Sequence, residues 1–167
     1  MDGFLEGEVA EYNQTGTKVV STFYEKGKKE GLATVYTNEG RINILAEFHH
    51  DNQNGMAYEY HPNGSLKKQV RFVEDLKDGE EQCFNRKGQM IAQAHYQVGK
   101  LDGVCCEWNN QGVLIFEGEY RQGRKHGKFN KYDQDGQPLL LQKFVDDELV
   151  EKKKLNNSQE IKKGLLI

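Results

Sequence analysis

The chain lacks the features that identify membrane and secreted proteins. No apolar run approaches the roughly 20 residues of a membrane-spanning helix, and the N-terminus has neither the basic start nor the apolar core of a secretory signal. Its three cysteines, Cys83, Cys105 and Cys106, are odd in number and follow no disulfide-framework spacing, which favours a reducing compartment. We therefore expect a soluble, cytoplasmic protein, and secretion as an effector stays open as an alternative.

An excess of positive charge is also missing. The 23 Lys and Arg residues are outnumbered by 26 Asp and Glu residues, which gives a net charge of −3 at pH 7. The polybasic signature of proteins that bind nucleic acid or anionic lipid is therefore absent. Proline is nearly absent as well, with 2 residues, whereas glycine is abundant, with 18. We expect no nucleic-acid partner, and charge alone names no other partner.

What the sequence has instead is a repeat of 24 residues that fits six times without an insertion. A glycine opens each period, an aromatic residue follows it by five positions, and a second glycine comes four positions later. The opening glycines are Gly7, Gly31, Gly55, Gly79, Gly103 and Gly127; the first aromatics are Tyr12, Tyr36, Tyr60, Phe84, Trp108 and Tyr132; the second glycines are Gly16, Gly40, Gly64, Gly88, Gly112 and Gly136. A second aromatic column holds Tyr24, Phe48, Phe72, Tyr96, Tyr120 and Phe144. A period of this length is typical of units that stack on their neighbours.

Each repeat has the pattern of a β-hairpin. The six residues from the opening glycine to the first aromatic show no helical spacing, and polar turn formers such as Asn109–Gly112 follow them. That sequence predicts a type I turn whose glycine takes the left-handed conformation as a one-residue bulge. A second tight turn then joins one hairpin to the next, and we place it at Lys26-Gly27, Asp51-Asn52, Val98-Gly99 and Gln122-Gly123. The sequence leaves open whether this second turn has two or three residues.

The returning strands alternate, and the alternation predicts one mainly buried and one mainly wet face. We pair each first aromatic with the residue six positions later, and we expect these pairs on the face of the second aromatics. The pairs are Tyr36 with Ile42, Tyr60 with Leu66, Phe84 with Met90 and Trp108 with Leu114. The wet row across from them is Phe23, Glu47, Arg71, His95, Glu119 and Lys143, whose mixed charges do not favour membrane binding.

The predicted fold is therefore all-β: an elongated single-layer antiparallel sheet of six 24-residue hairpin repeats. It spans residues 1–150 in twelve strands, begins in the middle of a repeat, and is followed by a C-terminal tail, residues 151–167. Ser158 could cap a short helix in that tail. Two buried aromatics cannot offset the ordering entropy of a whole repeat, so no repeat should fold alone.

One unit carries a family resemblance. Its residues are Phe116-Glu-Gly-Glu-Tyr120, Gly123-Arg-Lys-His-Gly127, Tyr132 and Gly136. They resemble the MORN (membrane occupation and recognition nexus) repeat, and the 24-residue spacing is similar to the bacterial MORN-variant proteins often labelled YwqK-type antitoxins. The resemblance implies an elongated sheet of hairpins that binds other proteins and, in some members, neutralises a toxin. Lipid binding, attributed to some eukaryotic members, is not expected, because the other repeats depart from this unit.

No constellation of catalytic, cofactor-binding or metal-ligating residues stands out. The cysteines have poor spacing for zinc, and the five histidines occupy different repeat positions with no nucleophile beside them. We expect structural cysteines, solvated or turn histidines, no cofactor and no enzymatic activity. The aromatic rows could alternatively line an open binding groove.

Recognition is then the expected task, and an extended surface suits a protein partner. The predicted function is a non-enzymatic protein-binding module with an antitoxin or immunity role. The alternatives are an accessory or scaffold domain of a larger enzyme or effector, and a phospholipid-binding module. Aromatic and arginine residues are common interface anchors, and they gather in the late repeats. The predicted partner-binding residues are Trp108, Tyr120, Arg121, Arg124 and His126.

Overall fold

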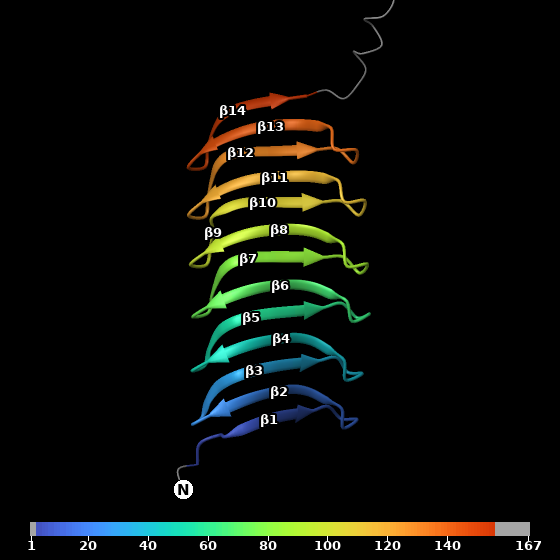
Figure 1. Cartoon of the computed structure of the whole chain (residues 1–167), viewed down its shortest axis with the longest axis vertical. Coiled ribbons are helices and arrows are strands. Elements are labelled where there is room, and N and C mark those ends of the chain that lie inside the picture. Colours follow the sequence, from blue (N-terminus) through green and yellow to red (C-terminus); the bar gives the residue numbers. More distant parts are fainter. Residues whose placement is uncertain (1–2, 156–167) are drawn as a thin grey trace, which may run out of the picture.

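The computed structural model describes residues 3–155, and within this range the chain forms one antiparallel sheet of stacked hairpins with no helix (Figure 1). Successive strands are neighbours throughout, except that the short β9 pairs beside β8 and the sheet continues from β8 to β10. The strands are β1 (Gly7–Tyr12), β2 (Lys18–Glu25), β3 (Lys28–Tyr36), β4 (Ile42–His49), β5 (Asn52–Tyr60), β6 (Leu66–Val73), β7 (Leu76–Phe84), β8 (Met90–Gln97), β9 (Lys100–Leu101), β10 (Gly103–Trp108), β11 (Leu114–Arg121), β12 (Arg124–Tyr132), β13 (Pro138–Val145) and β14 (Glu148–Lys154). The predicted single-layer all-β fold is confirmed.

The first turn of each repeat is the predicted turn with a glycine bulge. All six of its glycines have φ between 76° and 84°. In the fifth repeat the side chain of Asn109 accepts hydrogen bonds from the backbone N–H groups of Gln111 (2.9 Å) and Val113 (3.0 Å). The predicted pairing across this turn is also confirmed, since Trp108 lies opposite Leu114 and the equivalent residues pair in the other repeats.

The second turn has two residues, which settles the choice that the sequence leaves open. Both residues have positive φ, 47° to 52° at the first position and 64° to 82° at the second, as in the type I′ turns of hairpins. One prediction is off by a residue: the turn is His50-Asp51, not Asp51-Asn52, because Asn52 already pairs with His49. Asp51 takes the left-handed position and its carboxylate accepts the N–H of Lys29 at 2.8 Å. That hydrogen bond offsets part of the cost of a positive φ without glycine.

The two aromatic columns lie on opposite faces of the sheet, so the prediction that they share a face is wrong. Each second aromatic lies directly opposite an opening glycine, for example Phe144 opposite Gly127. The first aromatic follows that glycine by five residues, and side chains alternate along a strand, so it points to the other side. The bulge at the first turn shifts the pairing by one residue and hides this change of face.

Contacts in the last repeat agree with this assignment. The ring of Phe129 lies 5.1 Å from that of Tyr120 and 5.0 Å from that of Phe144. The hydroxyl of Tyr132, at an alternate position of the same strand, donates to Glu117 at 2.6 Å on the other side. We call the side that carries the second aromatic column the groove face and the other side the opposite face.

Neither face is covered, so the predicted mainly buried face is only half-buried. The buried hydrophobic residues in the described part of the chain are Ala46, Val70, Phe129 and Phe144. A single layer has nothing packed on it, and large apolar side chains such as Ile44 (39% exposed) and Val104 (49%) stay accessible. The sheet also continues across residue 150, because β14 pairs with β13 as far as Lys154. The helix expected after Ser158 lies outside the described residues.

Candidate functional site

A row of small residues crosses the groove face and leaves it hollow. Ala33, Ala46, Ala57 and Val70 lie opposite one another in four successive strands, β3 to β6. Further along, Cys105 lies opposite Gly118, which has no side chain. The second aromatic column follows the row on one side, because Phe48 and its equivalents lie two residues further along the same strands. The groove face therefore has low ground beside a line of rings.

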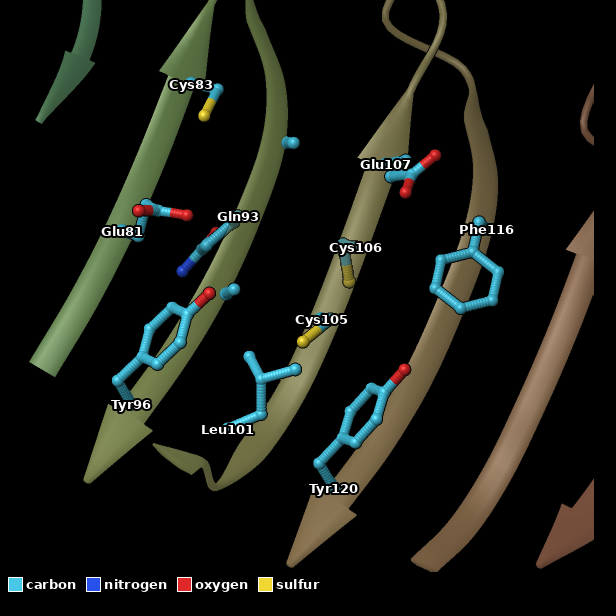
Figure 2. Close-up of a pocket in the computed structure, with 12 residues that line it drawn as sticks. Glu81, Cys83, Gln93, Tyr96, Leu101, Cys105, Cys106, Glu107, Phe116 and Tyr120 are labelled. Atoms are coloured by element: carbon cyan, nitrogen blue, oxygen red, sulfur yellow. The ribbon is translucent and has the colours of Figure 1, made fainter. Parts of the chain in front are cut away.

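The largest part of this low ground that aromatic residues enclose lies between β7 and β11 (Figure 2). It has a volume of about 220 Å³, and we call it the tyrosine hollow. Figure 2 shows the rings of Tyr96 and Tyr120 on neighbouring hairpins, with the Cys105 sulfur between them. Its lining residues are Glu81, Cys83, Ala92, Gln93, Ala94, Tyr96, Leu101, Cys105, Cys106, Glu107, Phe116 and Tyr120.

Two carboxylates in the lining differ in their partners. Glu81 forms an ion pair with Lys77, and the Lys77 ammonium also lies 4.6 Å from the centre of the Tyr96 ring. Glu107 is exposed, and no ion pair of its carboxylate occurs within residues 3–155. The tyrosine hollow thus combines an apolar floor with one carboxylate that is free to meet a cation.

The thiols of the hollow are poorly suited to nucleophilic chemistry. Burial raises the pKa of Cys83, with the Glu81 carboxylate adding to the effect, and burial likewise raises the pKa of Cys105. The reactive form of cysteine is the thiolate, so a raised pKa keeps both groups protonated and inert at neutral pH. Cys106, whose pKa burial also raises, alternates with Cys105 and points to the opposite face.

Four of the five predicted partner-binding residues gather at one end of β10 to β12. Tyr120 lines the tyrosine hollow, while Arg121 and Arg124 close the turn that follows it. Arg121 Nη2 lies 3.1 Å from Asp146 Oδ1, and His126 Nδ1 lies 3.3 Å from the same oxygen. The guanidinium of Arg121 is the first cause of a lowered pKa at Asp146. Sequence reasoning missed Asp146, although its place as a turn residue 20 positions after His126 could have indicated the contact.

Trp108 does not join this group. It lies on the opposite face near the first turn, where it lines a wide, open hollow of about 520 Å³ with Ile91, Ile115 and Gln134. The five predicted residues therefore do not form one site.

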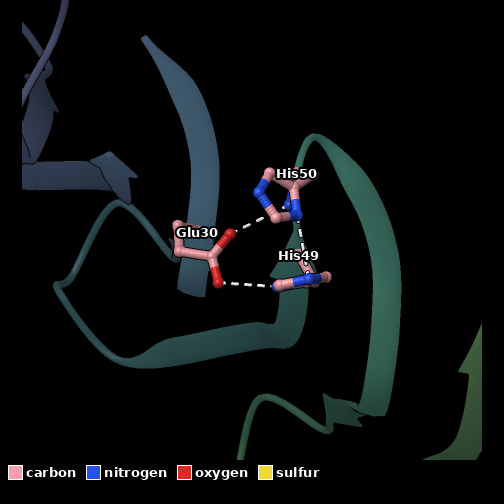
Figure 3. Close-up of side chains that lie close together, drawn as sticks. All are labelled: Glu30, His49 and His50. Atoms are coloured by element: carbon pink, nitrogen blue, oxygen red, sulfur yellow. Dashed lines mark hydrogen bonds and ion pairs between the residues drawn. The ribbon is translucent and has the colours of Figure 1, made fainter. Parts of the chain in front are cut away.

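A second cluster joins Glu30, His49 and His50 at the edge formed by the second turns (Figure 3). His49 Nδ1 lies 2.7 Å from Glu30 Oε1, and His49 Nε2 lies 2.8 Å from His50 Nδ1. The other oxygen of Glu30 accepts the backbone N–H of His50 at 2.9 Å, and this hydrogen bond is the main cause of the lowered pKa of Glu30. We call these three residues the histidine cluster.

The sequence contains a signal for this cluster that was not recognised. The residue before each opening glycine accepts the N–H of the first turn residue 20 positions later. Glu6 does so for Lys26, Asp78 for Val98 and Asp102 for Gln122. Glu30 holds the same position and therefore lies beside His50, with His49 adjacent in the chain. The histidines are turn and surface residues, as predicted, but they are not isolated.

The geometry can now be compared with known proteins. Two adjacent repeats match the MORN repeat variant. The family model covers residues 53–74 and 77–97, which lie in the third and fourth repeats. Repeats of this kind suggest a binding or interaction module. No curated protein matches the chain.

Solved structures with some likeness include glycosyltransferase-type entries of low similarity: TarM (13% identity, TM-score 0.32, 68% of this chain), a mutant of S. aureus TarM in complex with Fondaparinux, alpha-GlcNAc-glycerol and UDP (10%, 0.37, 73%) and the GtfA/B complex bound to UDP and GlcNAc (8%, 0.26, 92%). The chain spans only 18%, 21% and 27% of those chains, respectively. These TM-scores are too low to carry an argument about function.

Proposed function

We propose that the chain is a non-enzymatic module that binds a protein partner on its groove face, at the tyrosine hollow. The observation that carries this proposal is the hollow itself: two tyrosines and Phe116 around an apolar floor, beside an exposed carboxylate without an ion pair. Interface anchors are commonly aromatic side chains in a partly enclosed pocket, surrounded by polar groups. The match to the MORN repeat variant supports a binding role in general.

The chemistry of the hollow favours a partner segment that presents an apolar side chain next to a Lys or Arg. The apolar side chain would contact Cys105, Phe116 and Tyr120, and the cation would meet Glu107. Arg121 and Arg124 at the adjoining turn then supply the rim, where exposed charges steer association more than they add affinity. Arg121 is already paired with Asp146, so Arg124 is the more available of the two.

The specific version of this proposal is an antitoxin or immunity protein whose partner is a toxin. Its support is the resemblance of the late repeats to bacterial MORN-variant proteins. An accessory or scaffold domain of a larger enzyme or effector is the second version, and both share the groove face as the binding surface. A phospholipid ligand is disfavoured by the unpaired carboxylate in the hollow, which would repel an anionic headgroup.

The proposal is tested by affinity purification of the partner from native cells, followed by binding measurements on variants. Glu107→Lys is the sharpest variant, because the side chain is exposed and reversal of its charge leaves the packing intact. The matched control is Glu11→Lys, which makes the same change at the same repeat position in the first repeat, where the residue is also exposed. We expect Glu107→Lys to weaken binding at least about tenfold, since like-charge contacts cost several kcal/mol at an interface.

Further variants locate the interface. Arg121→Ala with Arg124→Ala should lower the association rate more than the dissociation rate changes, while Arg86→Ala, an exposed arginine at the other edge, serves as control. Trp108→Ala tests the opposite face. Unchanged affinity in Glu107→Lys, or a loss confined to Trp108→Ala, would contradict the assignment to the groove face. Failure to recover any protein partner would remove the main support for the antitoxin version.

A further inference from the structure

We propose that the histidine cluster, Glu30, His49 and His50, is a binding site for a divalent metal ion of the zinc class. The proposal is independent of the protein-binding function, because the cluster lies in the second repeat and shares no residue with the tyrosine hollow. Its three donor atoms, one carboxylate oxygen and two imidazole nitrogens, all lie within 4.8 Å of one another. Two imidazoles and one carboxylate form a common ligand set for Zn²⁺ sites that keep a coordination position open.

The spacing of the donor atoms fits such an ion after small rotations. Donors at 2.0–2.1 Å from a tetrahedral Zn²⁺ stand roughly 3.3 Å apart. The contacts of His49 with Glu30 (2.7 Å) and with His50 (2.8 Å) would open by about half an ångström, and the longest separation would close. Both imidazoles are exposed, so their rings can rotate without displacing packed neighbours.

The backbone already holds two of the ligands in place. Glu30 Oε2 accepts the N–H of His50 at 2.9 Å, which fixes the carboxylate and leaves Oε1 directed at the imidazoles (Figure 3). His50 is the first residue of a type I′ turn with φ of 50°, and His49 is the last residue of β4, so the turn fixes the relation between the two histidines. Ordered outer partners of this kind orient metal ligands and raise affinity.

The equivalent positions in the other repeats argue that the cluster is more than a structural contact. Elsewhere the residue before the opening glycine needs only one oxygen for its turn, as Asp78 does for Val98 and Asp102 for Gln122. The histidine positions hold Gln97 and Gln122 in those repeats, and the turn forms equally well. Two adjacent imidazoles are therefore not required to build this turn.

The surrounding charges permit a cation. Lys26 and Lys28 line a small hollow of about 200 Å³ beside Glu30 and His50, and Glu25 lines it with them. The Lys26 ammonium lies 3.6 Å from the Glu25 carboxylate, which directs it away from the cluster. Glu30 supplies the negative charge at the site, and its depressed pKa keeps it ionised at neutral pH.

Only three protein ligands are present, so a bound ion keeps at least one position for water or for a donor from another molecule. A soft-to-borderline ion is expected, since imidazole ligands suit Zn²⁺, Ni²⁺ and Cu²⁺ better than Mg²⁺ or Ca²⁺. The ion would tie the start of β3 to the end of β4 and so brace that hairpin.

The test uses the full chain without a histidine tag, stripped of metal with a chelator and titrated with Zn²⁺ by calorimetry. We expect one ion per chain and a higher melting temperature with Zn²⁺ but not with Mg²⁺. Titration with Co²⁺ should give visible absorption bands of a four- or five-coordinate site. His49→Gln and His50→Gln introduce the residue that other repeats carry at these positions, and each should weaken Zn²⁺ binding at least about tenfold.

Two further variants complete the design. Glu30→Gln keeps an oxygen for the His50 N–H but removes the charge, and it should also weaken binding. His95→Gln removes an exposed histidine outside the cluster and should leave binding unchanged. Circular dichroism checks that each variant is folded. The proposal is overturned if metal-free protein binds no Zn²⁺ in a one-to-one ratio, or if the double variant His49→Gln/His50→Gln binds it as tightly as the parent chain.

Discussion

Single residues in the second turns carry backbone strain that depends on the side chain. Each of these turns has a residue other than glycine at its first position, with φ near 50°. At Val98 that residue is β-branched, which makes the left-handed conformation more costly than it is for Lys26 or Gln122. The Val98 side chain is 62% exposed, so packing does not offset the cost. The turn is held by its hydrogen bonds, including that from the Val98 N–H to Asp78.

Replacement of Val98 by asparagine should therefore stabilise the protein. Asparagine tolerates φ near 50° well, so we expect the free energy of unfolding to rise by about 1 kcal/mol. Thermal and urea denaturation of Val98→Asn measure the change. The control is Val104→Asn, which changes an exposed valine in the extended backbone of β10 and should have no stabilising effect. Equal or lower stability of Val98→Asn would mean that the valine is not strained.

Gly118 lacks a side chain for a different reason, which is space rather than backbone conformation. A Cβ there would lie 2.7 Å from Cε1 of Phe129 and 3.0 Å from Cζ of Phe116. The same repeat position holds Ala46 where its cross-strand neighbours are Ala33 and Ala57. Small and large residues thus compensate across the strands.

Gly118→Ala should destabilise the sheet by about 1–3 kcal/mol, because overpacking forces the two phenylalanines to move. Denaturation midpoints give the value. In a Phe129→Leu background the same substitution should cost measurably less, and the double-mutant cycle isolates that coupling. Additive effects of the two substitutions would contradict a direct clash between the added methyl group and the Phe129 ring.

At the scale of the elements, the sequence predicted what is repeated and missed what varies between repeats. The hairpins, the glycine bulge after Asn109 and the pairing of Trp108 with Leu114 follow from columns that hold the same residue type throughout. The face of the first aromatics did not follow, because one bulged residue reverses the orientation and leaves no mark in the residue spacing. The histidine cluster was also missed, since Glu30 meets His50 through a turn contact between residues 20 positions apart.

A polar pair on the opposite face joins β11 to β12. Glu117 Oε1 accepts from the hydroxyl of Tyr132 (2.6 Å) and from the side-chain amide of Asn130 (2.7 Å). The Tyr132 hydrogen bond is the first cause of the lowered pKa of Glu117, followed by that of Asn130. These bonds favour the ionised carboxylate in the folded state.

The contribution of Glu117 to stability should accordingly depend on pH. Its folded pKa lies below its unfolded value of about 4.3, so the stabilisation is full above that value and is lost as the pH falls through the folded pKa. We expect Glu117→Gln to be less stable than the parent chain by on the order of 1 kcal/mol at pH 7. The difference should shrink below about pH 4. Melting curves of both proteins between pH 3 and 7 test this, and a difference independent of pH would contradict it.

At the scale of the whole molecule, the described part of the chain behaves as a one-dimensional stack. Each long strand pairs with the strands that precede and follow it, and no strand pairs across a greater distance in the order. Stability is then approximately a sum over neighbouring hairpins, and both faces stay accessible along the full length of the stack. Such a scaffold can place different sites in different repeats, as it does for the histidine cluster and the tyrosine hollow.

The same extended surface bears on the question of membranes. No helix among the described residues is long and apolar enough to cross a bilayer. Peripheral binding to anionic lipid would need a continuous basic surface, since each Lys or Arg near the membrane contributes about 1 kcal/mol. The exposed row on the opposite face instead alternates in charge, with Glu47 and Glu119 between Arg71 and Lys143, and the groove face carries Glu81 and Glu107. With a net charge of −3, neither face offers such a surface.

We therefore predict that the protein does not co-sediment with vesicles containing phosphatidylserine or phosphatidylinositol phosphates at physiological salt. A polybasic peptide provides the positive control, and neutral vesicles provide the background. The measurement is repeated at low salt, where the Debye length grows to about 30 Å at 0.01 M and weak attraction would be strongest. The net negative charge of the chain should then give repulsion rather than binding. Tight co-sedimentation that decreases as salt is added would contradict the prediction, because it would require a basic surface that the charge pattern does not provide.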